Sequence, residues 1–206
     1  MAKTDRLRRR RPVRDPYPRV LIVCEGKKTE SGYFKDLHHQ LRLPIDLDID
    51  AGGVPKTLVE RAAARKKESE RQSRRNRDST FRFDEIWCVF DVDEHPNLAE
   101  ARNQASANQL GVAISNPCFE LWVLLHFQDQ RGHIHRHEVQ KLCREHMPGY
   151  DKTLTFKVLE SRTDAALQRA AELSRWQEER GEAGANPSTG VHRLVERLLS
   201  VRRERG

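Results

Sequence analysis

EIWCVFDVDEH, residues 85–95, joins an apolar run to a cluster of acids. Residues 86–90 are five consecutive apolar residues, rich in β-branched and aromatic types, which predicts a strand buried on both faces. Because side chains alternate along a strand, Asp91 and Asp93 should point to the same side where the strand ends. Two adjacent carboxylates repel each other unless a cation lies between them, and Mg²⁺ prefers oxygen ligands. The alternative is a polar turn in which Asp93 or Asn97 caps the following helix.

A second apolar run, RVLIVC at residues 19–24, predicts another buried strand and leads into Glu25-Gly26-Lys27-Lys28-Thr29-Glu30. Gly26 permits a tight turn before an amphipathic helix that begins near Thr29. Glu25 therefore lies at the carboxyl end of a strand, which is where open α/β sheets bind ligands. The Gly-Lys-Lys-Thr segment is not a phosphate-binding P-loop, because that motif needs a glycine where this chain has Leu21. The alternative role for Glu25 is an interaction with the helix dipole.

The order of the remaining elements indicates the fold class. Residues 45–50 alternate between apolar and acidic side chains, which predicts a half-exposed strand near a sheet edge. Helices at 57–76 and 97–109 and a short strand at 111–114 complete an alternation that predicts an α/β fold, with a parallel sheet of about four strands flanked by helices. The predicted organisation is a disordered basic arm (1–18), an α/β core (19–130) and a helical C-terminal part packed on the core (131–206).

A buried carboxylate is expected after the last of these strands. Asn116 is a good N-cap and Pro117 a good first residue of a helix that is apolar nearly all round and should be buried. Glu120 is its one acid, and a carboxylate there must be paired or hydrogen-bonded. The residues alone leave open whether Glu120 has a structural or a functional role. In the C-terminal part we expect a long helix at about 155–182 and a terminal helix at 191–203.

The basic residues are concentrated in two segments. The chain has 206 residues and a net charge of +7; residues 1–19 hold eight Lys/Arg against two acids, and residues 60–82 hold nine against four. This asymmetry favours a polyanionic partner, most commonly nucleic acid, whereas the alternative is that these segments are simply solvated. The candidate phosphate contacts are Arg8, Arg9, Arg10, Arg11, Lys27, Lys56, Arg65, Lys66, Lys67 and Lys152.

The spacing of the cysteines and histidines predicts neither a disulfide framework nor a standard zinc finger. The four cysteines are far apart and contain no Cys-x-x-Cys pair, and three of them lie in apolar surroundings and are expected to be buried. His133, His135 and His137, followed by Cys143 and His146, suggest zinc, but their spacing matches no standard finger. The chain has no apolar run long enough for a membrane span and no signal-peptide core at its N-terminus, which predicts a cytoplasmic protein.

Several motifs in this order resemble the RloB-like family of bacterial abortive-infection and anti-phage loci. They are Val23–Glu30, Phe90–Asp93, Ser115–Trp122 and Asn186–His192, of which the Asn-Pro-x-Phe-Glu-Leu-Trp segment is the most specific. A Glu after a first strand and an Asp-x-Asp after a later one are similar to the arrangement of TOPRIM proteins. The resemblance implies a TOPRIM-like core in which Glu25, Asp91 and Asp93 hold Mg²⁺, with Mn²⁺ as a substitute.

The same resemblance implies phosphodiester hydrolysis, in which Glu25 is a general base or a metal ligand. Lys27, Lys28 or Lys152 would neutralise transition-state charge, and Glu120 is a further candidate catalytic residue. The expected activity is that of a nuclease acting on DNA or RNA, tRNA included, as the effector of a defence system with an ATPase encoded nearby. The alternative hypothesis is a non-catalytic nucleic-acid-binding or regulatory subunit of an ATPase-containing defence complex. The oligomeric state is left open.

Overall fold

The computed structural model describes residues 17–43, 45–92, 98–150 and 156–205, and its centre is a five-stranded sheet. The strand order is β2-β1-β3-β4-β5, with bounds β1 (Arg19–Cys24), β2 (Asp46–Ala51), β3 (Glu85–Asp91), β4 (Gly111–Asn116) and β5 (Ser188–Thr189). The first four pair in parallel and β5 pairs antiparallel to β4. The predicted parallel α/β sheet is confirmed, with one addition: the helical C-terminal region contributes the short fifth strand.

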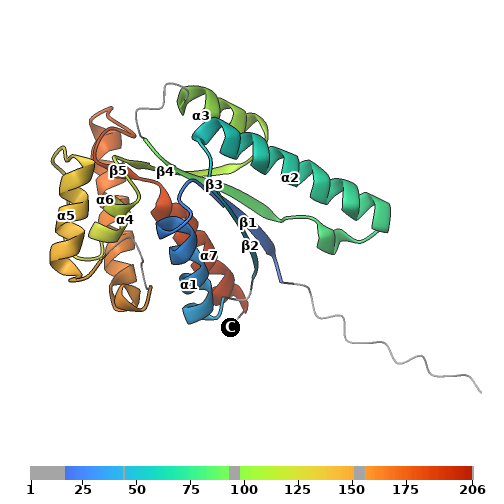
Figure 1. The fold of residues 1–206 in the computed structure, drawn as a ribbon, viewed down its shortest axis with the longest axis horizontal. Helices are drawn as coiled ribbons and strands as arrows, with labels where there is room; N and C mark the ends of the chain where they lie inside the picture. The colour runs from blue at the N-terminus through green and yellow to red at the C-terminus, as the bar shows by residue number, and fades with distance from the viewer. Residues whose placement is uncertain (1–16, 44, 93–97, 151–155, 206) are drawn as a thin grey trace, which may run out of the picture.

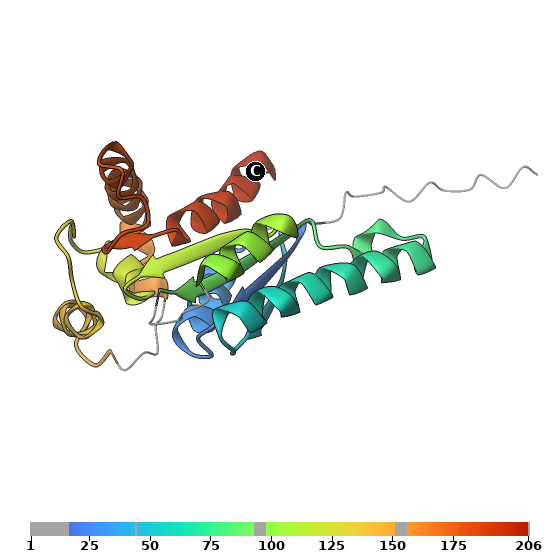
Figure 2. The same cartoon turned by 90° about the horizontal axis from the view of Figure 1, so that it is seen from above.

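Helices cover both faces of the sheet (Figures 1 and 2). On one face lie α2 (Pro55–Asn76) and α3 (Leu98–Ala107), with the 3-10 turn η1 (Ser79–Phe81) after α2. The other face carries α1 (Thr29–Leu41), α4 (Glu120–Leu124) and α7 (Val191–Arg205), while α5 (Arg136–His146) packs on α4, and α6 (Thr163–Glu179) packs on α7 and β5. No described helix is both long enough and apolar enough to cross a membrane.

The alternation of β1 explains why the sheet needs two covering layers. Val20, Ile22 and Cys24 belong to the core under α1 and the C-terminal helices, whereas Leu21 and Val23 belong to the core under α2 and α3. Successive side chains of a strand point to opposite faces, so a continuous apolar run must be buried on both. The edge strand β2 is only half-buried, as its alternating sequence predicts.

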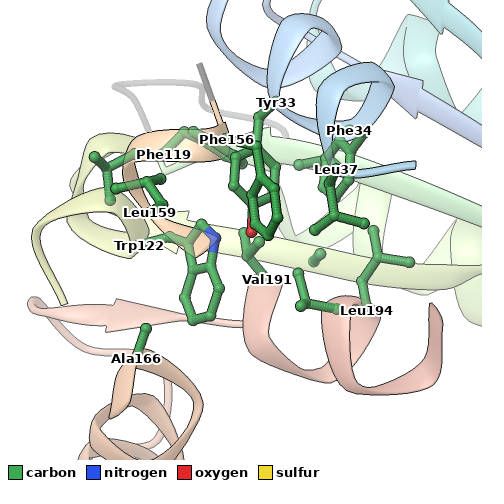
Figure 3. Close-up of a cluster of buried hydrophobic side chains, with 14 of the residues drawn as sticks. Tyr33, Phe34, Leu37, Phe119, Trp122, Phe156, Leu159, Ala166, Val191 and Leu194 are labelled. Carbon is green, nitrogen blue, oxygen red and sulfur yellow. The ribbon is translucent and has the colours of Figure 1, made fainter. Parts of the chain in front are cut away.

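An aromatic cluster fixes α1 against the segment that contains α4 (Figure 3). Tyr33 packs edge-on against Phe34, Phe119 and Phe156, with ring centroids 5.2, 5.6 and 5.7 Å away. Edge-to-face pairs contribute about 0.5–1.5 kcal/mol each beyond the area they bury. The N-termini of α1 and α4 are therefore held in a fixed relation, and each carries an acid that faces the same pocket.

Two helices begin later than predicted. Asn116 is the last residue of β4, the Asn116–Pro117 peptide is cis, and α4 begins only at Glu120. Asn116 and Pro117 have the residue types of a helix N-cap and first turn, but pairing with Ser188 of β5 keeps Asn116 in the sheet. The long helix expected at 155–182 is instead two 3-10 turns, η2 (Phe156–Val158) and η3 (Glu160–Arg162), followed by α6.

Candidate active site

The ends of β1 and β3 bring two of the predicted site residues together. The strands are neighbours with Cys24 opposite Val89, and the Glu25 N–H donates to the Val89 carbonyl at 3.0 Å. The Glu25 side chain then reaches across to β3, where its Oε2 accepts a hydrogen bond from the Asp91 N–H at 3.4 Å. Residues far apart in the chain thus meet at the carboxyl edge of the sheet, where open α/β folds bind ligands.

Six of the predicted site residues fall outside the described residues. They are Asp93, which was expected beside Asp91, the basic residues Arg8–Arg11, and Lys152. Among the described residues, Glu25 and Asp91 converge, together with side chains that the fold adds to them.

A pocket of ≈ 290 Å³ lies over this edge. It is lined by Glu25, Gly26, Lys27, Lys28, Thr29, Glu30, Asp91, Phe119, Glu120, Arg136 and Gln140. Four of these residues are acids and three are cations, and Lys27 and Lys28 are exposed at the rim. The predicted site residues Glu25, Lys28, Asp91 and Glu120 therefore share one pocket.

Glu120 enters the pocket from the first turn of α4 and is only 5% exposed. Its Oε1 accepts a hydrogen bond from Gln140 Nε2 at 3.5 Å, and its backbone carbonyl accepts from the Cys143 thiol at 3.5 Å. The requirement that this buried carboxylate be hydrogen-bonded is met by α5. Cys143 is buried, which raises the pKa of its thiol to about 12 and keeps the sulfur protonated.

Glu30 is a fourth acid of the pocket, and sequence reasoning missed it. Its side chain is 6% exposed, and burial raises its pKa, as do the charges of Glu120 and Glu25. Hydrogen bonds from the backbone N–H groups of Glu30 and Gly26 act in the opposite direction and favour the carboxylate. A buried acid with three acidic neighbours is an electrostatic cost that a bound cation would offset.

Gly26 makes room for that carboxylate. The chain turns between β1 and α1 here, but Gly26 does not have a positive φ, so its backbone conformation alone does not require glycine. A Cβ at Gly26 would lie 1.5 Å from Oε2 of Glu30 and 2.3 Å from its Cδ. The lack of a side chain at Gly26 therefore leaves the space that the Glu30 carboxylate occupies, four residues later.

Asp91 is the most perturbed acid of the pocket. Its pKa is well above the usual range because the side chain is buried and because the charges of Glu30, Glu120 and Glu25 oppose its ionisation. Arg136 acts against this shift, with its Nη2 3.0 Å from Asp91 Oδ2. The side chain of Asp91 is 13% exposed and that of Arg136 is 33% exposed, so the pair lies at the mouth of the pocket.

The position of Arg136 depends on the second Asn-Pro motif. Asn186 accepts a hydrogen bond from the Ile134 N–H at 3.0 Å and donates one to the Ile134 carbonyl at 2.9 Å. Two residues later α5 begins at Arg136, and Glu138 of its first turn accepts from the His135 N–H at 3.1 Å. Sequence reasoning noticed Asn186 but could not assign it this positioning role.

The donor set suits Mg²⁺ only in part. Within the described ranges, no three His, Cys, Asp or Glu side chains are close enough to hold a metal ion, the His-rich segment at 133–146 included. Glu25 and Asp91 nevertheless supply two carboxylates, and Mg²⁺ is commonly held by one or two carboxylates, waters and substrate phosphates. The described residues thus fit a Mg²⁺ ion whose coordination shell is completed by water and substrate phosphate, and not one held by protein ligands alone.

Most of the cations predicted on α2 have intramolecular partners. Lys56 pairs with Glu100 at 2.9 Å, Arg65 pairs with Asp48, and Lys66 Nζ donates to the Asn108 carbonyl at 2.7 Å. Lys67 is exposed. Half-buried cations with such partners brace α2 against the sheet and the end of α3, so they are less available to phosphates than the rim lysines.

Comparison with known proteins gives one finding. A family model described as RloB-like protein matches residues 20–198, which include the whole pocket. No curated protein and no solved structure matches the chain significantly.

Proposed function

The chain belongs to the RloB-like protein family, and from this premise we propose that it is a Mg²⁺-dependent nuclease of TOPRIM type. The observation that carries the proposal is the meeting of Glu25 and Asp91 at the ends of neighbouring parallel strands, inside a pocket with two further buried acids. Lys27 and Lys28 at the rim give the same pocket cations that suit a phosphodiester substrate.

The metal would be held by Glu25 and Asp91, with Asp93 as the third expected ligand. A bound Mg²⁺ supplies Lewis-acid chemistry: it polarises the phosphate, stabilises the leaving oxygen and lowers the pKa of a water. The nearby acids Glu30 and Glu120 oppose the ionisation of Asp91, and a divalent cation bound beside Asp91 would offset that repulsion.

The remaining steps belong to side chains of the pocket. Glu25 follows β1, its side chain reaches the end of β3, and it would accept the proton of the attacking water when it is not a ligand. Lys27 and Lys28 would neutralise charge on the scissile phosphate. Arg136, which now pairs with Asp91, lies close enough to exchange that carboxylate for a substrate phosphate, for which its planar guanidinium is suited.

We further propose that the protein acts in the cytoplasm as the effector of an anti-phage defence system, together with an ATPase encoded nearby. This part rests on the motifs shared with the RloB-like family, above all Ser115–Trp122, and on the two basic segments of the chain. The substrate class is nucleic acid, DNA or RNA.

Cleavage assays test the nuclease proposal directly. Labelled DNA, RNA and tRNA are incubated with Mg²⁺ or Mn²⁺ and with wild type, Asp91→Ala, Glu25→Gln or the control Glu179→Gln, which alters an exposed acid of α6. Both pocket variants should lose activity by about 10²-fold or more, the scale of a lost acid–base group, while the control cleaves normally. Absence of cleavage by folded wild type even with its ATPase, or equal cleavage by both pocket variants, would defeat the proposal.

A second candidate is a non-catalytic, nucleic-acid-binding subunit of an ATPase complex. The observation in its favour is that Asp91 already has a protein cation, Arg136, at 3.0 Å. Thermal melting separates the two. A metal present at 100 times its dissociation constant stabilises the native state by about 2.7 kcal/mol, a shift of about 5–11 °C for a chain of this size. The second candidate predicts no Mg²⁺ shift and nucleic-acid binding that survives Asp91→Ala.

A further inference from the structure

The distal end of α2 carries a basic surface far from the pocket. We call residues 67–82 the α2 tip; they hold six Lys/Arg against three Asp/Glu, a net charge of +3. In Figures 1 and 2 this end of α2 and η1 extends away from the sheet on the side opposite α4 and α5. Among the described residues of the tip, only Ser69 and Ser73 are buried, so it has little apolar packing of its own.

The tip lies at the opposite edge of the sheet from the pocket. Helix α2 starts beside the pocket rim, since a Cβ at Gly52 would contact the side chain of Lys27 at 2.6 Å. It ends beside the start of β1, where Arg19 Nη1 donates to the Phe81 carbonyl at 2.7 Å. At 1.5 Å per residue, the 22 residues of α2 span about 33 Å.

The cationic side chains between the pocket rim and the α2 tip already have partners within the protein. Arg61 pairs with Asp50 at 3.0 Å, and Arg65 and Lys66 have the partners described above. At the tip, Arg71 and Arg74 contact only acids of their own helix and remain about three-quarters exposed. Arg75, Arg77 and Arg82 are exposed and make no ion pair with any acid in the described part of the chain. The tip is therefore a separate cationic surface and not a continuation of the pocket.

Aromatic residues share a cleft with one of these arginines. The cleft, of ≈ 630 Å³, is lined by Tyr17, Phe81 and Arg82, together with Arg19 and the acids Asp46 and Asp84. Tyr17 is 52% and Phe81 37% exposed, the largest such values among the described aromatic residues. The two acids of the cleft already bind Arg19, through its Nε at 2.9 Å and its N–H at 2.7 Å. What the cleft offers a ligand is thus aromatic surface and the guanidinium of Arg82.

We propose that the α2 tip and this cleft form an anchoring site for single-stranded nucleic acid. Exposed aromatic rings next to arginines are the combination that binds unpaired bases and their phosphates together, whereas a duplex or an acidic protein would use the charges alone. The link to cleavage rests on the proposed function: a strand held at the tip would reach the pocket with about ten nucleotides if they keep the roughly 3.4 Å spacing of stacked bases, and with fewer if the strand is extended.

The test compares two variants that lose the same charge. Arg75→Gln/Arg77→Asn/Arg82→Gln alters the tip, and asparagine suits the left-handed conformation of residue 77, whose φ is 51°. Lys157→Gln/Arg175→Gln/Arg202→Gln removes three exposed cations elsewhere. Circular dichroism and melting confirm folding, and fluorescence anisotropy measures binding of a 20-nucleotide single strand in EDTA over a series of salt concentrations.

The tip variant should lose about 2 from the magnitude of the log–log salt slope, because each phosphate contact on a single strand contributes about 0.7. If the tip variant and wild type bind equally at 1 M salt, this difference in slope makes the variant's binding about 100-fold weaker at 0.1 M. Phe81→Ala should weaken single-strand binding by roughly tenfold and leave duplex binding unchanged. The matched control variant should bind like wild type.

Three results would overturn the proposal: equal binding by the tip and control variants, equal loss of duplex and single-strand binding in Phe81→Ala, or displacement of the strand by polyglutamate as effectively as by unlabelled strand. The last would assign the surface to an acidic protein. Because EDTA excludes metal-dependent chemistry, a failed cleavage assay does not affect this test, and an inactive anchoring site does not affect the cleavage assay.

Discussion

Replacing Gly26 by alanine tests whether the pocket is built around the Glu30 carboxylate. The added Cβ would lie 1.5 Å from Glu30 Oε2, so the carboxylate must leave its place and its backbone donors lose their acceptor. A hydrogen bond to a charged group contributes about 1.5–3 kcal/mol, so we expect Gly26→Ala to lower the free energy of unfolding by about 2–4 kcal/mol. For a chain of this size, that corresponds to a fall in Tm of about 4–16 °C.

Urea denaturation and thermal melting measure this effect, and the same helix offers a matched control. A Cβ at Gly32 of α1 meets no atom within 4 Å, so Gly32→Ala should stabilise the protein by up to about 1 kcal/mol through helix propensity. The Glu30→Ala variant lacks the carboxylate that the new Cβ would meet, so adding Gly26→Ala to it should change the free energy of unfolding little. A Gly26→Ala protein as stable as wild type, or one equally destabilised without Glu30, would refute the reasoning.

Three further perturbations address the charges and the support of the pocket. Burial and neighbouring acids raise the folded-state pKa of Asp91 and Glu30, so the folded chain binds more protons than the unfolded one just above the ordinary carboxyl pKa. Stability should therefore increase as pH falls through that window, and Glu30→Gln should raise Tm at pH 8 and flatten the profile in melts from pH 5 to 8. Arg136→Gln should increase Mn²⁺ affinity roughly tenfold in calorimetry, because it removes the cation that now pairs with Asp91; unchanged affinity would contradict this. Asn186→Ala should lower the free energy of unfolding by about 1–3 kcal/mol in urea, since both backbone groups of Ile134 lose their partner.

Local sequence signals were sufficient for the parts of the fold that depend on strand burial. The apolar runs before Glu25 and Asp91 specify strands covered on both faces, and a parallel sheet then brings their carboxyl ends to one edge. The meeting of these two residues could thus be predicted without coordinates. The alternating segment at 45–50 likewise predicted an edge strand, because period-two polarity leaves one face in water.

The rest of the pocket depends on tertiary packing that has no local signature. In the sequence Glu30 has the appearance of an ordinary acid in the first turn of a helix. In the structure it is buried against Gly26. Arg136 lies in a His-rich segment that suggested zinc, and it reaches Asp91 because Asn186 holds the preceding backbone. The Asn116–Pro117 segment has the residues of a helix start, yet pairing with a two-residue strand from the C-terminal region keeps it in the sheet.

The most direct test of the cation site is calorimetric titration of Mn²⁺ into wild type, Glu25→Gln, Asp91→Asn and the exposed-acid control Glu179→Gln. If acids from the two strand ends hold one cation together, wild type and control bind Mn²⁺ with the same affinity, and each pocket variant binds at least tenfold more weakly. A wild-type protein that binds no Mn²⁺, or pocket variants that bind it as tightly as the control, would contradict a metal-dependent site at this edge of the sheet.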